Sequence, residues 1–189
     1  GQIIFNFFSD ATTSAMSAVI NNAALIKKVY MPKYLFVISR VFSSFINLLA
    51  SFTALLVVMI ATRAELHWKV VFAVIPLGFI VVFSLGVGLL LSALVVKFRD
   101  IMHLYSVFIT ALLYLTPVIY PMSSLPYWMQ KVVGLNPITN ILMMFRDVML
   151  YDNFPNLSSI LIATIESLAA LGIGVYVFYK KQDEFILNI

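Results

Sequence analysis

An uncharged run of 27 residues, from 70 to 96, is the feature that most restricts the fold of this chain. About 20 apolar residues in an α-helix cross the hydrocarbon core of a bilayer, so this run predicts a membrane-spanning helix. Backbone groups find no water in that core, and only helices and closed barrels satisfy them there. Other apolar segments predict further crossings over 1–20, 34–61, 104–120 and 157–179.

The composition agrees with a chain that lies mostly in lipid. It is 62% hydrophobic and 11% charged over 189 residues, whereas soluble domains carry about 25% charged residues. We therefore predict an all-α integral membrane protein, a polytopic helical bundle. With no cysteine, disulfides and thiolate metal sites are excluded, and we predict no metal site. The net charge of +4 does not indicate nucleic acid, because in a membrane protein the positions of the basic residues matter more than their sum.

The stretch from Lys97 to Pro137 contains features that a simple series of spans does not need. A charged knot, Lys97-Phe98-Arg99-Asp100, precedes the uncharged run of residues 104–120. Proline removes a backbone donor and clashes with the preceding turn, so a straight helix does not continue past both prolines at its far end. The apolar pieces that follow, including 138–150, are too short to span. We predict a re-entrant helical hairpin before the last span, marked by Pro117, Tyr120, Pro121, Asn136 and Pro137.

The segment 21–33 predicts a short basic helix between the first two spans. Leu25, Ile26 and Val29 can share one of its faces, with Lys27 and Lys28 elsewhere and a proline at position 32 to end it. From the residues alone, two interpretations remain open. The segment is either an ordinary basic loop at the cytoplasmic surface or a helix that docks on another protein.

Polar and small residues recur every four positions in three of the predicted spans. A polar stripe, Ser39, Ser43, Asn47 and Ser51, should turn away from lipid, either to bond a neighbouring helix or to line a path or a dimer contact. Small residues at 84, 88 and 92 allow a neighbouring helix to approach closely. In the last span, Glu166 shares a face with residues 170 and 174, so we expect its carboxyl group to point into the bundle.

The basic residues predict the orientation. Five crossings that begin outside assign eight basic residues to the inner segments and four to the outer ones, which obeys the positive-inside bias. The inner set is Lys27, Lys28, Lys33, Arg40, Lys97, Arg99, Lys180 and Lys181, and the outer set is Arg63, Lys69, Lys131 and Arg146.

Three motifs carry a resemblance to a known family. They are Phe98-Arg99-Asp100-Ile101, Tyr114-x-Thr116-Pro117-Val118-x-Tyr120-Pro121 and Leu135-Asn136-Pro137. In this order they resemble the matching segments of ABC-2-type exporter permeases, above all those that move lipid-linked polysaccharides such as O-antigen, capsule and teichoic acid. The tail, residues 180–185, is similar to the C-terminal signature of the polysaccharide exporters.

The resemblance implies a single permease domain over 1–189, part of a six-span half-transporter of the bacterial plasma membrane whose amino-terminal interfacial helix and first span are missing here. It implies a second copy of the permease and two ABC ATPase subunits. The chain has no Walker motif, so we expect no catalytic site or cofactor in it, and ATP and Mg²⁺ in the partner ATPase. The coupling helix to that partner would be Leu25, Ile26, Lys27, Lys28, Val29, Tyr30, Met31 and Pro32, with Arg99 and Asp100 as a cytoplasmic charged knot.

The resemblance also implies a path for the lipid-linked glycan along the permease dimer interface, with aromatic rings along it. By analogy we expect Tyr105, Phe108 and Tyr114 to line it together with Asn47, although Tyr114 points away from the other two rings on an ideal helix. Two alternatives stay open: an exporter of the same architecture for a drug or small lipid, and an integral membrane lipid-linked sugar transferase. The transferase would need clustered acids or histidines, and those of this chain are scattered.

Overall fold

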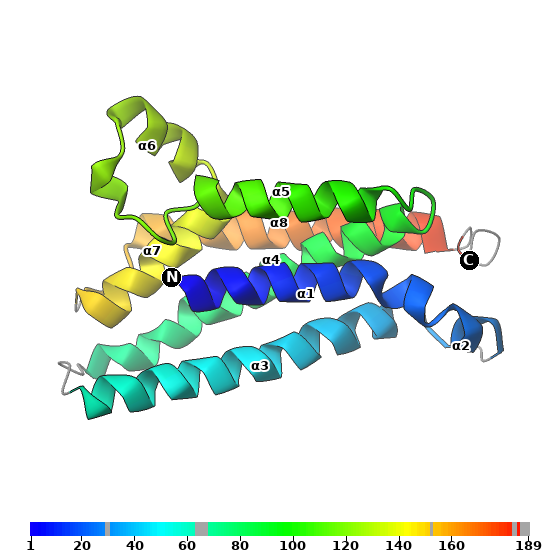
Figure 1. Ribbon diagram of the computed structural model, residues 1–189, viewed down its shortest axis with the longest axis horizontal. Coiled ribbons are helices and arrows are strands. Elements are labelled where there is room, and N and C mark those ends of the chain that lie inside the picture. Colours follow the sequence, from blue (N-terminus) through cyan, green and yellow to red (C-terminus); the bar gives the residue numbers. More distant parts are fainter. Residues whose placement is uncertain (29–30, 63–67, 152, 183–184, 186–189) are drawn as a thin grey trace.

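A computed structural model describes residues 1–28, 31–62, 68–151, 153–182 and 185, which form a bundle of helices (Figure 1). The predicted all-α fold is confirmed for this part of the chain. The elements, in chain order, are α1 (Gln2–Asn21), α2 (Ala23–Lys28), α3 (Tyr34–Ala61), the 3-10 helix η1 (Trp68–Ala73), α4 (Val74–Val95), α5 (Ile101–Leu115), the 3-10 helix η2 (Met122–Ser124), α6 (Tyr127–Gly134), α7 (Pro137–Leu150) and α8 (Leu157–Lys181).

Four of these segments are long and apolar enough to cross a membrane: α1, α3, the continuous stretch Trp68–Val95, and α8. The remaining predicted crossing corresponds to α5, which has 15 residues and is therefore about 22 Å long, shorter than a hydrocarbon core of about 30 Å. Figure 1 nevertheless shows α5 running alongside the long helices, antiparallel to α1 and α4. The helices therefore run back and forth through the bundle in the order that the sequence predicts.

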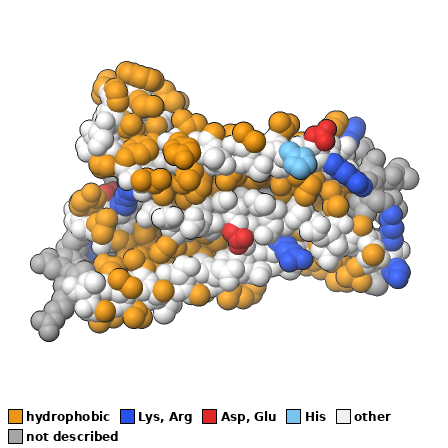
Figure 2. Space-filling view, viewed as in Figure 1, with side chains coloured by type: hydrophobic (Ala, Val, Ile, Leu, Met, Phe, Trp, Pro, Cys, Tyr) orange, Lys and Arg blue, Asp and Glu red, His pale blue; other side chains and the backbone are white. Residues whose placement is uncertain are grey.

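The two ends of the bundle differ in kind. Figure 1 shows α2, the turn between α4 and α5, and the carboxyl end of α8 at one end, and α6 at the opposite end. Basic side chains gather at the α2 end (Figure 2), as the charge-based topology predicts for the cytoplasmic side. Of the basic residues assigned to the outside, Arg63 lies outside the described residues.

The centre of the bundle is α4, which packs against α1 on one side and α8 on the other. A methyl group added to Gly88 would lie 2.7 Å from Cβ of Ala15, and one added to Gly86 would overlap the backbone of Ala170. The side chain of Ser84, on the same helix, is fully buried. Gly88 therefore does what its spacing predicts, since it lets α1 approach α4 closely, and Gly86, outside that spacing, brings the backbone of α8 onto α4.

The helix before the hairpin breaks where its prolines predict. Helix α5 ends at Leu115, before Pro117, and polar side chains from α7 hold the turn that follows. Asn136 caps α7 by accepting a hydrogen bond from the Ile138 N–H, and its side-chain amide donates to Oγ1 of Thr116 at 2.9 Å. Arg146 donates to the Val118 carbonyl at 3.0 Å. At the end of α5 itself, the Tyr120 hydroxyl donates to the Tyr114 carbonyl at 2.8 Å. These bonds satisfy polar groups of the helix end and the turn inside the protein, as membrane depth requires.

Helix α7 is the second half of this hairpin. The sequence predicts a re-entrant or interfacial helix here, and the structure favours the re-entrant form. Ile141 and Leu142 are fully buried and Met144 is almost so. A helix lying at the membrane surface would leave one broad face in water, whereas α7 packs against α4 and α8.

The contact between α4 and α8 gives a stability prediction. A Cβ atom at Gly174 would overlap the Gly86 carbonyl oxygen, whereas one at Gly172 meets open space. We expect Gly174→Ala to force α4 and α8 apart and to lower the free energy of unfolding by about 1–3 kcal/mol. Gly172→Ala, on the same helix, is the matched control and should leave it unchanged or slightly higher. Thermal unfolding of both variants in one detergent checks this, and equal midpoints would contradict the packing.

Candidate functional site: a polar groove along α1

Helix α1 has two unlike faces. Ile4, Phe8, Ala11 and Ala15 are buried in the core of the bundle. The opposite face carries polar side chains at helical spacing, and these are Gln2, Asn6, Ser9, Asp10, Thr13 and Ser17. Because α1 is long and apolar enough to span, this polar face lies at membrane depth. Polar groups there are costly unless protein or water satisfies them.

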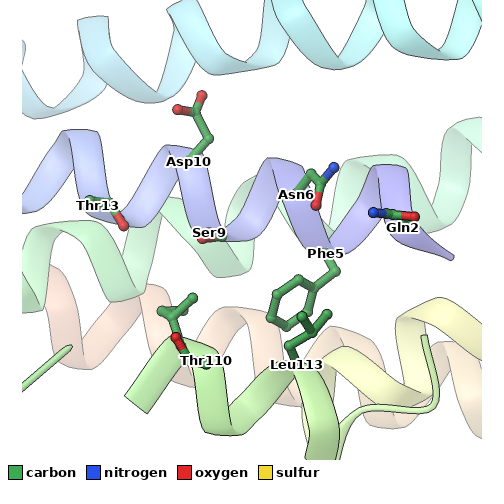
Figure 3. A pocket seen from close by; sticks show the side chains of 9 residues that line it. Gln2, Phe5, Asn6, Ser9, Asp10, Thr13, Thr110 and Leu113 are labelled. Carbon is green, nitrogen blue, oxygen red and sulfur yellow. The ribbon is translucent and has the colours of Figure 1, made fainter. Parts of the chain in front are cut away.

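A groove runs between the polar face of α1 and α5. Its volume is about 480 Å³, and α5 contributes Ile109, Thr110 and Leu113 to its wall. Figure 3 shows the α1 side chains from Gln2 to Thr13 along this wall, with Thr110 and Leu113 facing them from α5.

A second groove, of about 240 Å³, runs between α1 and α3. Asn6 and Asp10 line both grooves, so the two are adjacent sides of one polar ridge. We call them together the α1 groove. From α3, Asn47 and Ser51 join this lining, and Ser44 donates a hydrogen bond of 2.6 Å to Oδ2 of Asp10. Figure 2 shows the resulting band, poor in hydrophobic side chains, between α5 and α3.

Asp10 is the most costly group in this groove. It lies near the middle of α1, its side chain is exposed in the single chain, and Figure 3 shows its carboxyl group pointing toward α3. A carboxylate at mid-membrane costs about 2.5–3.5 kcal/mol or more when it faces lipid. The α1 groove is therefore a surface for water, cargo or more protein rather than for lipid tails.

The polar stripe of α3 has the same orientation. Ser39, Ser43, Asn47 and Ser51 are all exposed in the single chain. Ser39 donates to its own helix, to the Phe36 carbonyl, whereas Ser44, beside the stripe, makes the bond to α1. The stripe has two interpretations. The structure favours the lining of a path or a contact with another chain over hydrogen bonds between helices of the same chain.

The predicted path residues separate into two groups. Asn47 lies in the α1 groove, but the aromatic residues of α5 do not line it. Tyr105 is buried, and its hydroxyl donates to Oγ1 of Thr12 at 2.7 Å, so it attaches α5 to α1. The Phe108 ring lies 6.0 Å from that of Tyr105 but is exposed. Tyr114 is 67% exposed and, as expected from helix geometry, apart from the other two.

The structure describes the first part of the predicted coupling helix as α2, Ala23–Lys28. Met31 and Pro32 are exposed and not helical, in line with a helix that Pro32 ends. Val29 and Tyr30 lie outside the described residues. Within α2, Ile26 is buried against the bundle, Leu25 is 44% exposed, and Lys27 and Lys28 are exposed. The knot residues Arg99 and Asp100 are exposed at the same end of the bundle (Figure 1).

Sequence reasoning did not assign a role to the polar face of α1. The signal was the recurrence of Gln2, Asn6, Asp10 and Thr13 every three or four residues along this predicted span. The inward direction expected for Glu166 is confirmed in part. Its side chain is half-buried, and its Oε2 atom is buried without a hydrogen-bond partner in the described part of the chain.

Residues 1–150 match the family profile described as ABC-2 type transporter. The chain belongs to this family. It is thus a multi-pass membrane subunit of a transporter, and the match covers the helices from α1 to α7 that form the groove and the hairpin.

Two relatives of known name match nearly the whole chain. An O-antigen export system permease protein of Myxococcus xanthus is 24% identical over 191 residues, covering 100% of this chain and 74% of the relative. A protein with the same description from Klebsiella pneumoniae is 24% identical over 187 residues, covering 98% of this chain and 71% of the relative. This ABC-2 permease therefore resembles them along its length, α8 included.

Accessibility of the groove can be tested with single cysteines, because the chain has none. We expect cysteine at Asn6 or Asn47 to react with a small charged thiol reagent, since water reaches polar grooves of this size. Cysteine at Ala11, on the buried face of the same helix, is the matched control and should react at least about tenfold more slowly. Labelling rates in the membrane-embedded protein measure this. Equal rates at Asn6 and Ala11 would show that the groove is closed to water.

Proposed function

We propose that this chain is the permease subunit of an ATP-driven exporter that moves a lipid-linked polysaccharide across the bacterial plasma membrane. The observation that carries the proposal is the α1 groove, a polar surface with a carboxylate at mid-depth of a spanning helix. The ABC-2 family membership and the O-antigen export named for the relatives support it. The cargo would be O-antigen or a related chain such as capsule or teichoic acid.

The chemistry of the groove suits a glycan. Its lining offers amides from Gln2, Asn6 and Asn47 and hydroxyls from Ser9, Ser51 and Thr110. These groups donate and accept hydrogen bonds in many directions, which fits a chain of sugar hydroxyls that must slide rather than stay bound. Phe108 and Tyr114 on α5 are exposed, and their ring faces can receive the apolar faces of sugar rings if the path widens over α5.

A second copy of the permease would complete this path. Apart from Tyr105, α5 buries little of its surface in its own chain, and Leu104, Val107 and Tyr114 are among its most exposed residues. A polar groove open to lipid on one side is costly. A homodimer that covers the groove removes this cost and encloses the route between two like surfaces.

The ATPase partner would dock at α2. The exposed Leu25 and the lysines beside it give an apolar anchor with a basic rim, and Arg99 and Asp100 lie at the same end of the bundle. ATP and Mg²⁺ would bind the partner. Closure of the ATPase pair then moves α2, provided that the two permease states contact the partner differently.

The alternatives are a drug or small-lipid exporter and a sugar transferase of the membrane. A drug or lipid path favours an apolar lining throughout. The α1 groove mixes apolar side chains such as Phe5, Ile109 and Leu48 with amides, hydroxyls and a carboxylate, and this mixture suits the amphipathic surface of a glycan. ABC-2 membership supports a transport subunit rather than an enzyme. Neighbouring genes separate these further, because glycosyltransferase genes beside an ATPase gene accompany a glycan exporter.

Blocking the groove tests the path. We expect Asn6→Trp to fill the groove where its two branches meet and to lower the amount of surface glycan by about tenfold or more, because an added barrier of 1.4 kcal/mol already slows a step tenfold. Ile165→Trp, at an exposed position on α8, is the matched control and should leave export unchanged. Surface glycan in cells with equal amounts of each variant in the membrane measures this. Full export by Asn6→Trp would contradict the proposed route.

Docking of the ATPase can be tested separately from the path. Burial of a leucine side chain contributes about 1.5–3 kcal/mol, so Leu25→Glu should weaken co-purification of the ATPase with the permease by about tenfold or more. Lys180→Glu places a carboxylate at an exposed position of the same end, on α8, and serves as the control. If Leu25→Glu retains the ATPase as well as the unsubstituted chain does, α2 is not the docking helix.

A further inference from the structure

Phe185, four residues beyond the end of α8, is buried in the bundle. It is only 1% exposed, and its ring meets the ring of Phe178, near the end of α8, edge to face at 5.3 Å between centroids. So complete a burial needs a further partner besides Phe178.

That partner is Lys33, at the junction between α2 and α3. It is the residue immediately before α3, and its Nζ atom lies 5.5 Å from the centroid of the Phe185 ring. The same Nζ donates to the backbone carbonyl of Gln182, the residue that ends α8. The last carbonyls of a helix lack partners within it, and a lysine that supplies one also complements the negative end of the helix dipole.

These four residues, Lys33, Phe178, Gln182 and Phe185, form what we call the tail clamp. It joins the start of α3 to the end of α8, which lie at the same end of the bundle as α2 (Figure 1). At its other end the α2 segment follows α1, where the Asn22 side chain donates to the Ala18 carbonyl at 2.7 Å. The elbow around α2 is thus held at both ends.

We infer that the tail clamp is a mechanical link that carries movement of α2 into α8, with Lys33 and Phe185 as its positioning residues. The inference rests on the proposed docking of an ATPase at α2. Displacement of the elbow pulls on the carboxyl end of α8 through the clamp. Because α8 packs backbone to backbone on α4 at Gly86 and Gly174, α4 follows. The permease thereby has a second route for the stroke, beside the direct covalent one into α1 and α3.

The clamp has a feature that a merely structural contact does not need. It combines a hydrogen bond, a cation over a ring and a ring pair, so it resists sliding in several directions at once. Packing a tail onto the bundle requires burial alone. Loss of the cation at Lys33 should therefore impair transmission even when Phe185 remains buried.

The test uses the full-length permease with its ATPase in lipid nanodiscs. One spin label on Tyr176→Cys of α8 and one on Ile60→Cys of α3, both exposed positions, report the movement of α8 when ATP is trapped. A cross-link from Ala24→Cys of α2 to the ATPase reports docking. We expect Phe185→Ala and Lys33→Met to keep the cross-link but to reduce the ATP-dependent fraction of shifted molecules by about fivefold or more, the low end of usual coupling factors.

Conservative and distant variants complete the design. Lys33→Arg keeps the cation and the donor and should restore most of the shift, whereas Phe42→Ala, an exposed aromatic on α3, should behave as the unsubstituted protein. An unchanged α8 shift in Phe185→Ala and Lys33→Met, with docking intact, would overturn the clamp and leave the proposed function in place. No ATP-dependent change of any label in the unsubstituted complex would overturn the proposed function and the clamp with it.

Discussion

The structure depends on the direct packing of helix backbones around α4. In lipid there is little hydrophobic force between helices, so association relies on close contact. Gly88 admits Ala15 of α1, and Gly86 and Gly174 bring α4 and α8 into contact. Once α1 is pressed onto α4 by its small residues, its opposite face must point outward. The polar groove is therefore a consequence of where the small residues lie.

The groove in turn explains why α5 is packed so lightly. Tyr105 attaches α5 to α1 through a single buried hydrogen bond to Thr12, and the hairpin residues Asn136 and Arg146 hold its far end. Ile109, Leu112 and Leu113 of α5 pack only partly buried against the core, so α5 covers the groove without filling it. A fully packed α5 would close the groove that the proposed function needs. The light packing of α5 therefore keeps the proposed route open.

Much of the fold could be predicted from the sequence because its signals are local. Helix lengths follow from uncharged runs, and the end of α5 follows from Pro117 and Pro121. The position of the groove depends on contacts between residues that are far apart in the chain. Asp10 and Asn6 are polar residues within an apolar span, but one sequence does not say which helices flank them. Tyr105 was expected on the path by analogy with the family, yet its partner Thr12 lies 93 residues away in the chain.

The two ends of the bundle differ in the elements that they carry, and both are arranged around the packing of α4. The basic elbow and the carboxyl end of α8 lie at one end, and the hairpin of α6 and α7 lies at the other (Figure 1). Both ends are bonded to the bundle by polar groups that meet backbone carbonyls, Lys33 at Gln182 and Arg146 at Val118. Such bonds are directional and can be exchanged, unlike the glycine contacts in the middle. A rigid centre with exchangeable bonds at both ends lets an input at the elbow alter the hairpin without unpacking α4.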